Sequence, residues 1–173
     1  MIELLARRDF DEVFALMEAS FPQNEYRPYY EQKALLDDPA YSIYTFSDMG
    51  DGAVRAFIAV WKFDDLAFIE HFAVNPRYRN GGIGAQMLRE VVDSLKTMVC
   101  LEVEPPHDEF SARRIAFYER NGFRLNEYPY IQPPIAQRRE AVSLLIMTWG
   151  ESVSEEVFER IKATLYSNVY KLR

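Results

Sequence analysis

The chain of 173 residues is long enough to form one domain with a full hydrophobic core. Its net charge of -7 argues against a general binder of nucleic-acid backbones, which needs a basic face. The single cysteine, Cys100, allows no internal disulfide and favours a reducing compartment. No apolar run is long enough to span a bilayer, and the N-terminus lacks the pattern of a signal peptide. We therefore expect a cytoplasmic protein that uses neither nucleic acid nor a membrane.

The first half of the chain predicts two helices and a meander of strands. Val13, Phe14 and Met17 have helical spacing, and further on the apolar residues follow the pattern of strands separated by tight turns. In chain order we expect a strand over 1–5, a helix capped by Asp9, a helix over 30–36, strands over 41–46, 53–63 and 66–74, and turns at 49–52 and 64–65.

The second half changes to helical spacing and then returns to strands. A strand, a helix and a strand in succession imply a right-handed crossover and a parallel pair. We expect helices over 83–95, 110–120 and 152–170, and strands over 98–103, 123–128 and 141–148, with a Pro-rich loop before the last strand.

The last predicted helix begins with Ser152 and Glu155, which have the spacing of a capping box. Its apolar residues, including Val157, Phe158 and Ile161, fall on one face. We expect this face to cover the core of a single domain spanning 1–173, with 151–173 as a helical extension packed on it. The alternative is a homodimer contact.

The glycine loop between 79 and 84 is predicted to bind an anion. Gly81, Gly82 and Gly84 lie where a helix begins, so backbone N–H groups can converge on one anion at the positive end of the helix dipole. Arg77 and Arg79 add positive charge nearby. A purely structural turn is the alternative.

Other uses of the glycines fit less well. Asn80-Gly81 is a common hairpin turn, but helical spacing follows it. A dinucleotide fingerprint would need a third glycine at Met87. A mononucleotide P-loop would need Lys followed by Ser or Thr after its last glycine, whereas Ala85 and Gln86 follow Gly84.

Two motifs in the chain resemble those of the GCN5-related N-acetyltransferase (GNAT) family. Arg79-Asn-Gly-Gly82-Ile-Gly84 is similar to the signature loop of the family. Leu101-Glu-Val103, followed by Ile115-Ala-Phe-Tyr118 and Asn-Gly122-Phe123, is similar to a second motif. The resemblance implies an α+β fold of three layers (α/β/α), with a mixed, mostly antiparallel sheet whose central parallel pair splays at the cofactor site. It also implies an enzyme, an N-acetyltransferase.

The resemblance implies acetyl-CoA as cofactor. The loop would hold the CoA diphosphate, and the backbone of a strand end would pair with the pantetheine arm. Many members carry Asn where this chain has Ser111, and usually Ala where it has Arg114, so Arg113 or Arg114 is an alternative contact for a phosphate or an acidic part of the substrate. The implied cofactor contacts are Phe72, Ala73, Val74, Arg79, Asn80, Gly81, Gly82, Ile83, Gly84, Ser111, Arg114 and Phe117.

The chemistry expected is direct attack of a primary amine on the thioester through a tetrahedral intermediate. Tyr118 matches the family tyrosine near the CoA sulfur, and we expect it to protonate the leaving thiolate. Glu102 and Glu70, on predicted inner strands, are the candidate bases, because burying an unpaired carboxylate is costly outside a site. The alternative is a structural ion pair with Arg113, Arg114 or His71, and His71 is expected on the opposite face from Glu70.

The acceptor is a small-molecule or peptide amine that the sequence does not name. Glu104 and aromatic residues near the predicted acceptor site suggest a cup for a cationic amine. Cys100 is expected to be a buried small apolar residue, and two histidines with one cysteine make no metal set, so we predict no metal. The alternative function is an inactive CoA-binding sensor or interaction module. The acceptor aromatics are Phe21, Tyr26, Tyr29, Tyr30, Tyr128 and Tyr130.

Overall fold

The computed structural model describes residues 1–47 and 52–172, so the turn predicted at 49–52 lies outside the described residues except for Gly52. The described strands form one seven-stranded sheet in the order β1-β2-β3-β4-β5-β7-β6. They are β1 (Ile2–Leu4), β2 (Tyr41–Ser47), β3 (Val54–Lys62), β4 (Leu66–Val74), β5 (Met98–Val103), β6 (Phe123–Gln132) and β7 (Val142–Trp149).

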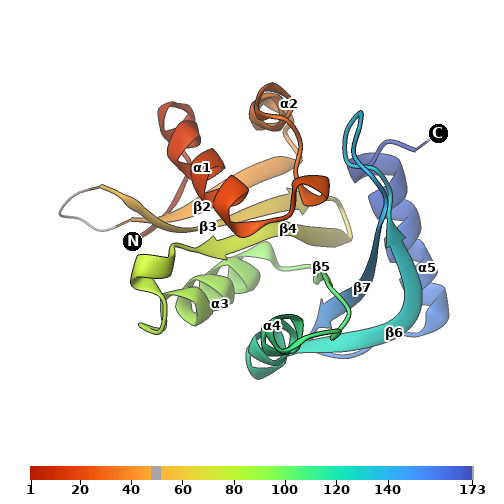
Figure 1. Ribbon diagram of the computed structural model, residues 1–173. Coiled ribbons are helices and arrows are strands. Elements are labelled where there is room, and N and C mark those ends of the chain that lie inside the picture. The colour runs from red at the N-terminus through yellow and green to blue at the C-terminus, as the bar shows by residue number, and fades with distance from the viewer. Residues whose placement is uncertain (48–51, 173) are drawn as a thin grey trace.

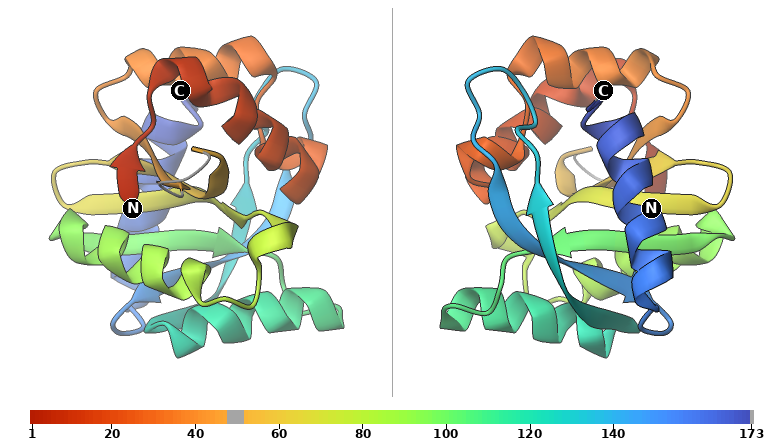
Figure 2. Two further views of the ribbon diagram at one scale, coloured as in Figure 1. Left: turned by 90° about the vertical axis from the view of Figure 1, so that its left-hand side faces the viewer. Right: turned by 90° about the vertical axis from the view of Figure 1, so that its right-hand side faces the viewer.

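Helices cover both faces of this sheet (Figure 1). α1 and α2 lie over one face, and α3 and α4 lie over the other; α5 packs beside β6 and β7 (Figure 2). The predicted three-layer α+β fold is confirmed. The α-helices are α1 (Phe10–Ser20), α2 (Tyr29–Ala34), α3 (Ile83–Leu95), α4 (Glu109–Arg120) and α5 (Glu155–Thr164), and α5 continues into a π-helical turn (Leu165–Val169).

Two apolar clusters, one on each face, hold the layers together. β3 belongs to both: Phe57 and Trp61 face the cluster under α1 and α5, and Ile58 and Val60 face the cluster under α3. A strand that is covered on both faces needs an almost continuous apolar run rather than alternation. This explains why residues 53–63 could be recognised as a strand from the sequence.

The parallel pair is short, and its strands then separate. β4 pairs with β5 only from Leu66–Met98 to Ile69–Leu101. β3 continues to pair with β4 up to Val74, whereas β5 pairs with β7. At the point of separation the β3–β4 register shifts, because Ala59 faces His71 while Val60 faces Ile69. Glu70 is therefore the extra residue of a β-bulge, which bends its strand locally.

Most element boundaries differ from the predicted ones by a few residues, and two of these differences have a clear cause. Ser154, not Ser152, caps α5, and its hydroxyl accepts a hydrogen bond from the Val157 N–H (3.4 Å). β6 extends beyond Tyr128, because Pro129 lies in an edge strand at an interruption of the β6–β7 ladder, where its missing N–H does no harm.

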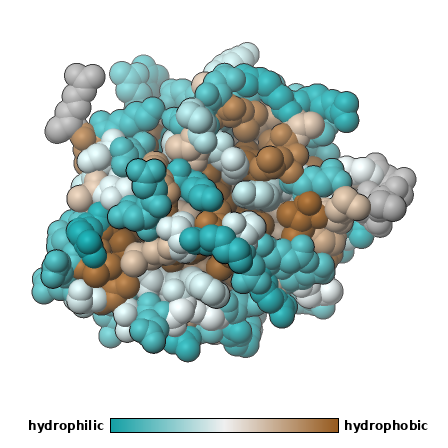
Figure 3. All heavy atoms as spheres, turned by 180° about the vertical axis from the view of Figure 1, so that it is seen from behind, coloured by the Kyte–Doolittle hydropathy of each residue, from teal (hydrophilic) through white to brown (hydrophobic). Residues whose placement is uncertain are grey.

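The last helix turns its apolar face inward. Phe158 and Ile161 of α5 are buried against the same cluster as α1. On the face shown in Figure 3, apolar atoms form several separate patches between hydrophilic side chains. Within the described residues, no helix has the length and apolar character needed to cross a membrane.

Candidate active site

The glycine loop forms the start of α3. Gly82 occupies the N-cap position with a φ of 77°, and Asn80 also has a positive φ, of 67°. Both values lie in the left-handed region, which glycine adopts freely and asparagine tolerates. The first N–H groups of a helix have no partner within it, so this end of α3 presents donors to an anion.

Gly84 lets α3 approach β4 closely. A Cβ atom at this position would lie 3.1 Å from Val74 Cγ2 and 3.4 Å from Phe72 Cζ, closer than ordinary contacts. The Arg79 side chain returns to the same strand, where its Nε donates to the Val74 carbonyl oxygen (3.1 Å). The loop is thus fastened to the end of β4, beside the opening between β4 and β5.

One edge of β4 is used by β3 and the other faces the opening. Phe72, Ala73 and Val74 pair with β3, while the β4–β5 pairing ends at Ile69. An extended ligand arm inserted between the two strands would meet β4 backbone that pairs with no strand on this side, as in the addition of a strand to a sheet edge. Phe117 from α4 packs beside this edge, with its ring centroid 6.0 Å from that of Phe72.

Ser111 and Arg114, also on α4, differ in what they offer. Ser111 is 3% exposed and serves a capping box: its N–H and its hydroxyl both donate to Asp108 Oδ1, at 2.7 and 2.9 Å. Its hydroxyl is therefore already committed to the helix start. Arg114 instead reaches the pocket described next, with its guanidinium over the rings of Phe21 and Phe110.

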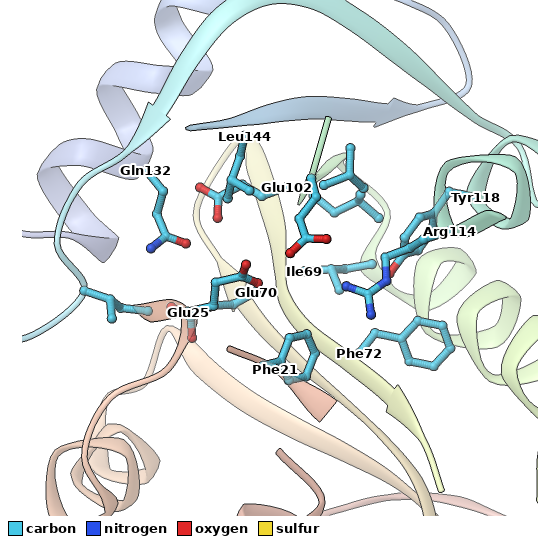
Figure 4. Close-up of a pocket in the computed structure, with 14 residues that line it drawn as sticks. Phe21, Glu25, Ile69, Glu70, Phe72, Glu102, Arg114, Tyr118, Gln132 and Leu144 are labelled. Atoms are coloured by element: carbon cyan, nitrogen blue, oxygen red, sulfur yellow. The ribbon is translucent and has the colours of Figure 1, made fainter. Parts of the chain in front are cut away.

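A pocket lies where β4 and β5 separate, and it contains about 540 Å³ of space, partly open to solvent. Arg114, Tyr118 and Phe72 lie together at one side, and Gln132 and Leu144 lie at the other (Figure 4). Four carboxylates line the pocket, those of Glu25, Glu70, Glu102 and Glu104.

Glu102 is held by two phenols. The hydroxyls of Tyr130 and Tyr170 donate to its Oε1 at 2.5 and 2.7 Å, and Tyr170 is also 2.8 Å from Oε2. Burial raises the pKa of Glu102 to about 7, against the two hydrogen bonds, which stabilise the ionised form. A carboxyl group with this pKa exchanges a proton near neutral pH, as a general base must.

Glu70 pairs with Arg27, a residue that sequence reasoning did not consider. Their side chains are 2% and 7% exposed, and Arg27 Nη1 lies 2.9 Å from Glu70 Oε1. The expectation that His71 lies on the opposite face is wrong, because the bulge places His71 Nδ1 3.6 Å from Glu70 Oε2. Burial lowers the pKa of His71, so the ring is neutral, and its Nε2–H donates to the Glu25 carbonyl oxygen (2.7 Å).

Glu25 is a second residue that sequence reasoning missed. It lies in the segment between α1 and α2, and its carboxyl group meets that of Glu104 from β5's end. Burial and the neighbouring Glu104 charge raise the pKa of Glu25 to about 7. A run of polar residues in a loop gave no signal that one of them would face a carboxylate 79 positions away.

Tyr118 lies at the other side of the pocket, on α4. Its side chain is 7% exposed, and burial raises its pKa to about 12, so the phenol stays protonated at neutral pH. A protonated hydroxyl facing the opening between β4 and β5 can donate a proton there.

The predicted acceptor aromatics are spread over the pocket, the core and the surface. Phe21 lines the pocket, and Tyr130 reaches it through Glu102. Tyr30 is 84% exposed, and the remaining three are engaged elsewhere. Those three are Tyr26 in the core, Tyr29 bonded to Asp11, and Tyr128 bonded to the Val153 carbonyl oxygen.

Cys100 is fully buried, as predicted, and burial raises the pKa of its thiol well above the usual value. Arg113 is not a partner of the pocket carboxylates, because it pairs with Glu109 on the surface of α4. In the described part of the chain, no cluster of three or more His, Cys, Asp or Glu side chains is arranged to hold a metal ion.

Comparison with known proteins agrees with this geometry. The family model "Acetyltransferase (GNAT) family" matches residues 10–123. A solved structure from Bacteroides thetaiotaomicron, assigned to the GNAT family of acetyltransferases, has 32% identity and a TM-score of 0.86, covering 100% of this chain and 99% of its own. A search of curated protein sequences gives no match.

Two more distant structures share the fold. The ribosomal-protein-S18-alanine N-acetyltransferase of Escherichia coli has 22% identity and a TM-score of 0.64, covering 90% of this chain and 96% of its own. A variant spermidine N-acetyltransferase from Vibrio cholerae has 14% identity and a TM-score of 0.64, covering 97% and 98%. On the family match and the 32% identical relative, the chain belongs to the GNAT family of acetyltransferases.

Proposed function

We propose that the protein transfers the acetyl group of acetyl-CoA directly to a primary amine. One observation carries the proposal: the glycine loop at the start of α3 lies against the end of β4, and the pocket where β4 and β5 separate contains both Tyr118 and Glu102. An anion site, a strand edge that pairs with no strand, a proton donor and a proton acceptor are thereby brought close together.

The residues of the loop fit a CoA diphosphate. A side chain at Gly82 would extend into open space, whereas a side chain at Gly84 would press against the side chains of β4. Backbone N–H groups at the start of α3 would bind the diphosphate, with Arg79 and Asn80 beside them. The β4 edge at Phe72, Ala73 and Val74 would pair with the pantetheine arm, which carries the thioester toward Tyr118.

The proposed reaction needs one acyl transfer and three proton transfers. Glu102 accepts the proton that the ammonium must lose before its nitrogen is nucleophilic. The nitrogen then adds to the thioester carbon to form a tetrahedral intermediate. When this intermediate collapses, the carbon–sulfur bond breaks and Tyr118 gives its proton to the leaving sulfur. The second amine proton, lost as the amide forms, restores the Tyr118 hydroxyl through water, and Glu102 releases the first proton to solvent.

Glu70 has a supporting role in this proposal. Its carboxylate lines the pocket but is paired with Arg27, so we assign the proton exchange to Glu102. The pocket carboxylates together favour an acceptor that arrives as a cation. Arg114 balances part of this charge, as its effect on Glu25 indicates.

Binding and turnover are tested separately. Calorimetry with acetyl-CoA measures donor binding, and a thiol assay measures CoA released with a panel of amines. We expect binding, turnover with at least one primary amine, and a fall in kcat/KM of at least about 100-fold in Glu102→Gln. Tyr118→Phe should lower kcat but leave the Kd of acetyl-CoA unchanged.

Two outcomes would contradict the proposal. A protein that binds no acetyl-CoA does not use the loop as described. A protein that binds acetyl-CoA but acetylates no amine in a broad panel is a CoA-binding sensor or interaction module of the same fold.

A further inference from the structure

The turn after α5 contacts one buried carboxylate of the pocket directly and a second one through Arg27. The Tyr170 hydroxyl donates to Glu102 at 2.7 Å. The preceding residue, Val169, offers its carbonyl oxygen to Arg27 Nη2 at 3.3 Å, and the same guanidinium pairs with Glu70. Val169 and Tyr170 are thus linked to two different carboxylates, Glu70 through Arg27 and Glu102 directly. Each carboxylate lies more than 60 positions earlier in the chain.

A π-helical turn makes this double contact possible. After α5, the Tyr170 N–H donates to the Leu165 carbonyl oxygen at 3.0 Å, which spans five residues instead of four. Val169 and Tyr170 are both buried, at 3% and 8% exposure. Isolated π-helical turns occur frequently at functional sites, where they change the direction in which side chains point. Leu165, fully buried, anchors the turn in the core.

We propose that Tyr170 is a positioning residue for Glu102, which it aims into the pocket and holds in the ionised form. The inference rests on the proposed function, in which Glu102 accepts the proton of the amine. It assigns part of the active site to the C-terminal segment, well beyond residue 123, where the match to the family model ends.

Removing the Tyr170 hydroxyl has a predictable electrostatic effect. The hydrogen bond lowers the pKa of Glu102, while burial and the charges of Glu70 and Glu25 raise it. Tyr170 itself stays neutral, because burial raises its pKa well above 10. Two hydroxyls bond to Glu102, those of Tyr130 in β6 and Tyr170. The other titratable or charged groups that interact with it come from the surrounding elements: Glu70 of β4 with its partner Arg27, Glu25 before α2, the neutral Cys100 thiol of β5, and Tyr166 of the π-helical turn.

The test is the pH dependence of kcat/KM in Tyr170→Phe, which retains the packed ring. Loss of one hydrogen bond to a carboxylate should move the acidic limb upward by about one pH unit. The ratio of variant to wild-type kcat/KM should be about 0.1 at pH 6 and approach 1 at pH 9. The Kd of acetyl-CoA should not change. Tyr166→Phe is the matched control, since that hydroxyl bonds to the Ile131 carbonyl oxygen instead, and its profile should follow the wild type.

A double variant separates this inference from the proposed function. If Tyr170 acts through Glu102, adding Tyr170→Phe to Glu102→Gln should cause no further change in the pH profile. An equal loss of activity at all pH values, or an unshifted profile, would overturn the positioning role while Glu102→Gln remains impaired. If Glu102→Gln itself retains full activity and its acidic limb, the proposed base is wrong, and the positioning role is overturned with it.

Discussion

Replacing Gly82 by valine tests the proposed anion site of the glycine loop directly. The φ of 77° at Gly82 is in the left-handed region, where an L-residue is destabilised by about 1–2 kcal/mol and a β-branched one falls at the upper end. No atom lies within 4 Å of a Cβ placed there, so the added side chain points into the open space from which an anion would approach. Valine should therefore strain the loop and obstruct the ligand.

The magnitude follows from that strain. If the loop keeps its conformation, the melting temperature should fall by about 2–8 °C, at about 2–4 °C per kcal/mol for a chain of this size. If the loop relaxes to another conformation, the ligand must restore the strained one when it binds. The same 1–2 kcal/mol then weakens binding and raises the Kd of acetyl-CoA by about 5- to 30-fold. Obstruction of the diphosphate adds to this increase in either case.

Gly150 supplies the matched control. It has a φ of 92°, and a Cβ placed on it would likewise meet no atom within 4 Å. Gly150 comes directly after β7 and is not part of the glycine loop. Gly150→Val should lower the melting temperature similarly without changing the Kd of acetyl-CoA, measured by calorimetry. An unchanged Kd in Gly82→Val would refute the assignment of the CoA diphosphate to the glycine loop.

Two further predictions concern buried groups. Arg27→Met leaves Glu70 without its partner and should lower the free energy of unfolding, measured by urea titration, by about 3–5 kcal/mol. The control is Arg7→Met, which breaks an exposed pair with Asp37 and should change the free energy of unfolding by less than about 1 kcal/mol. A small effect at Arg27 would show that the pair is solvated. Cys100→Ala should keep kcat and lose about 1 kcal/mol of stability, because the thiol only fills space in the core; loss of turnover with the fold intact would refute direct transfer.

Local patterns in the chain were sufficient to predict the fold and to propose the anion site of the glycine loop. Apolar periodicity identified the elements, since each helix or strand must present one apolar face or stripe to the core. The glycines at 81, 82 and 84 and the residues after them pointed to an anion site, because backbone conformation and the residue types that permit it are local properties. The burial of Cys100 followed from its apolar neighbours.

The surroundings of the pocket carboxylates were decided by contacts between distant segments. Strict alternation predicted Glu70 and His71 on opposite faces, and a one-residue bulge brought them together. No local pattern reveals a bulge, because it depends on the register of the partner strand.

The sequence by itself therefore determined the layers of the fold, the glycine loop and the candidates Tyr118, Glu70 and Glu102. Only the tertiary structure decided that Arg27 neutralises Glu70 and that Tyr170 holds Glu102. The physical reason is that the ionisation of a buried carboxyl group is set by what surrounds it, and these partners come from opposite ends of the chain.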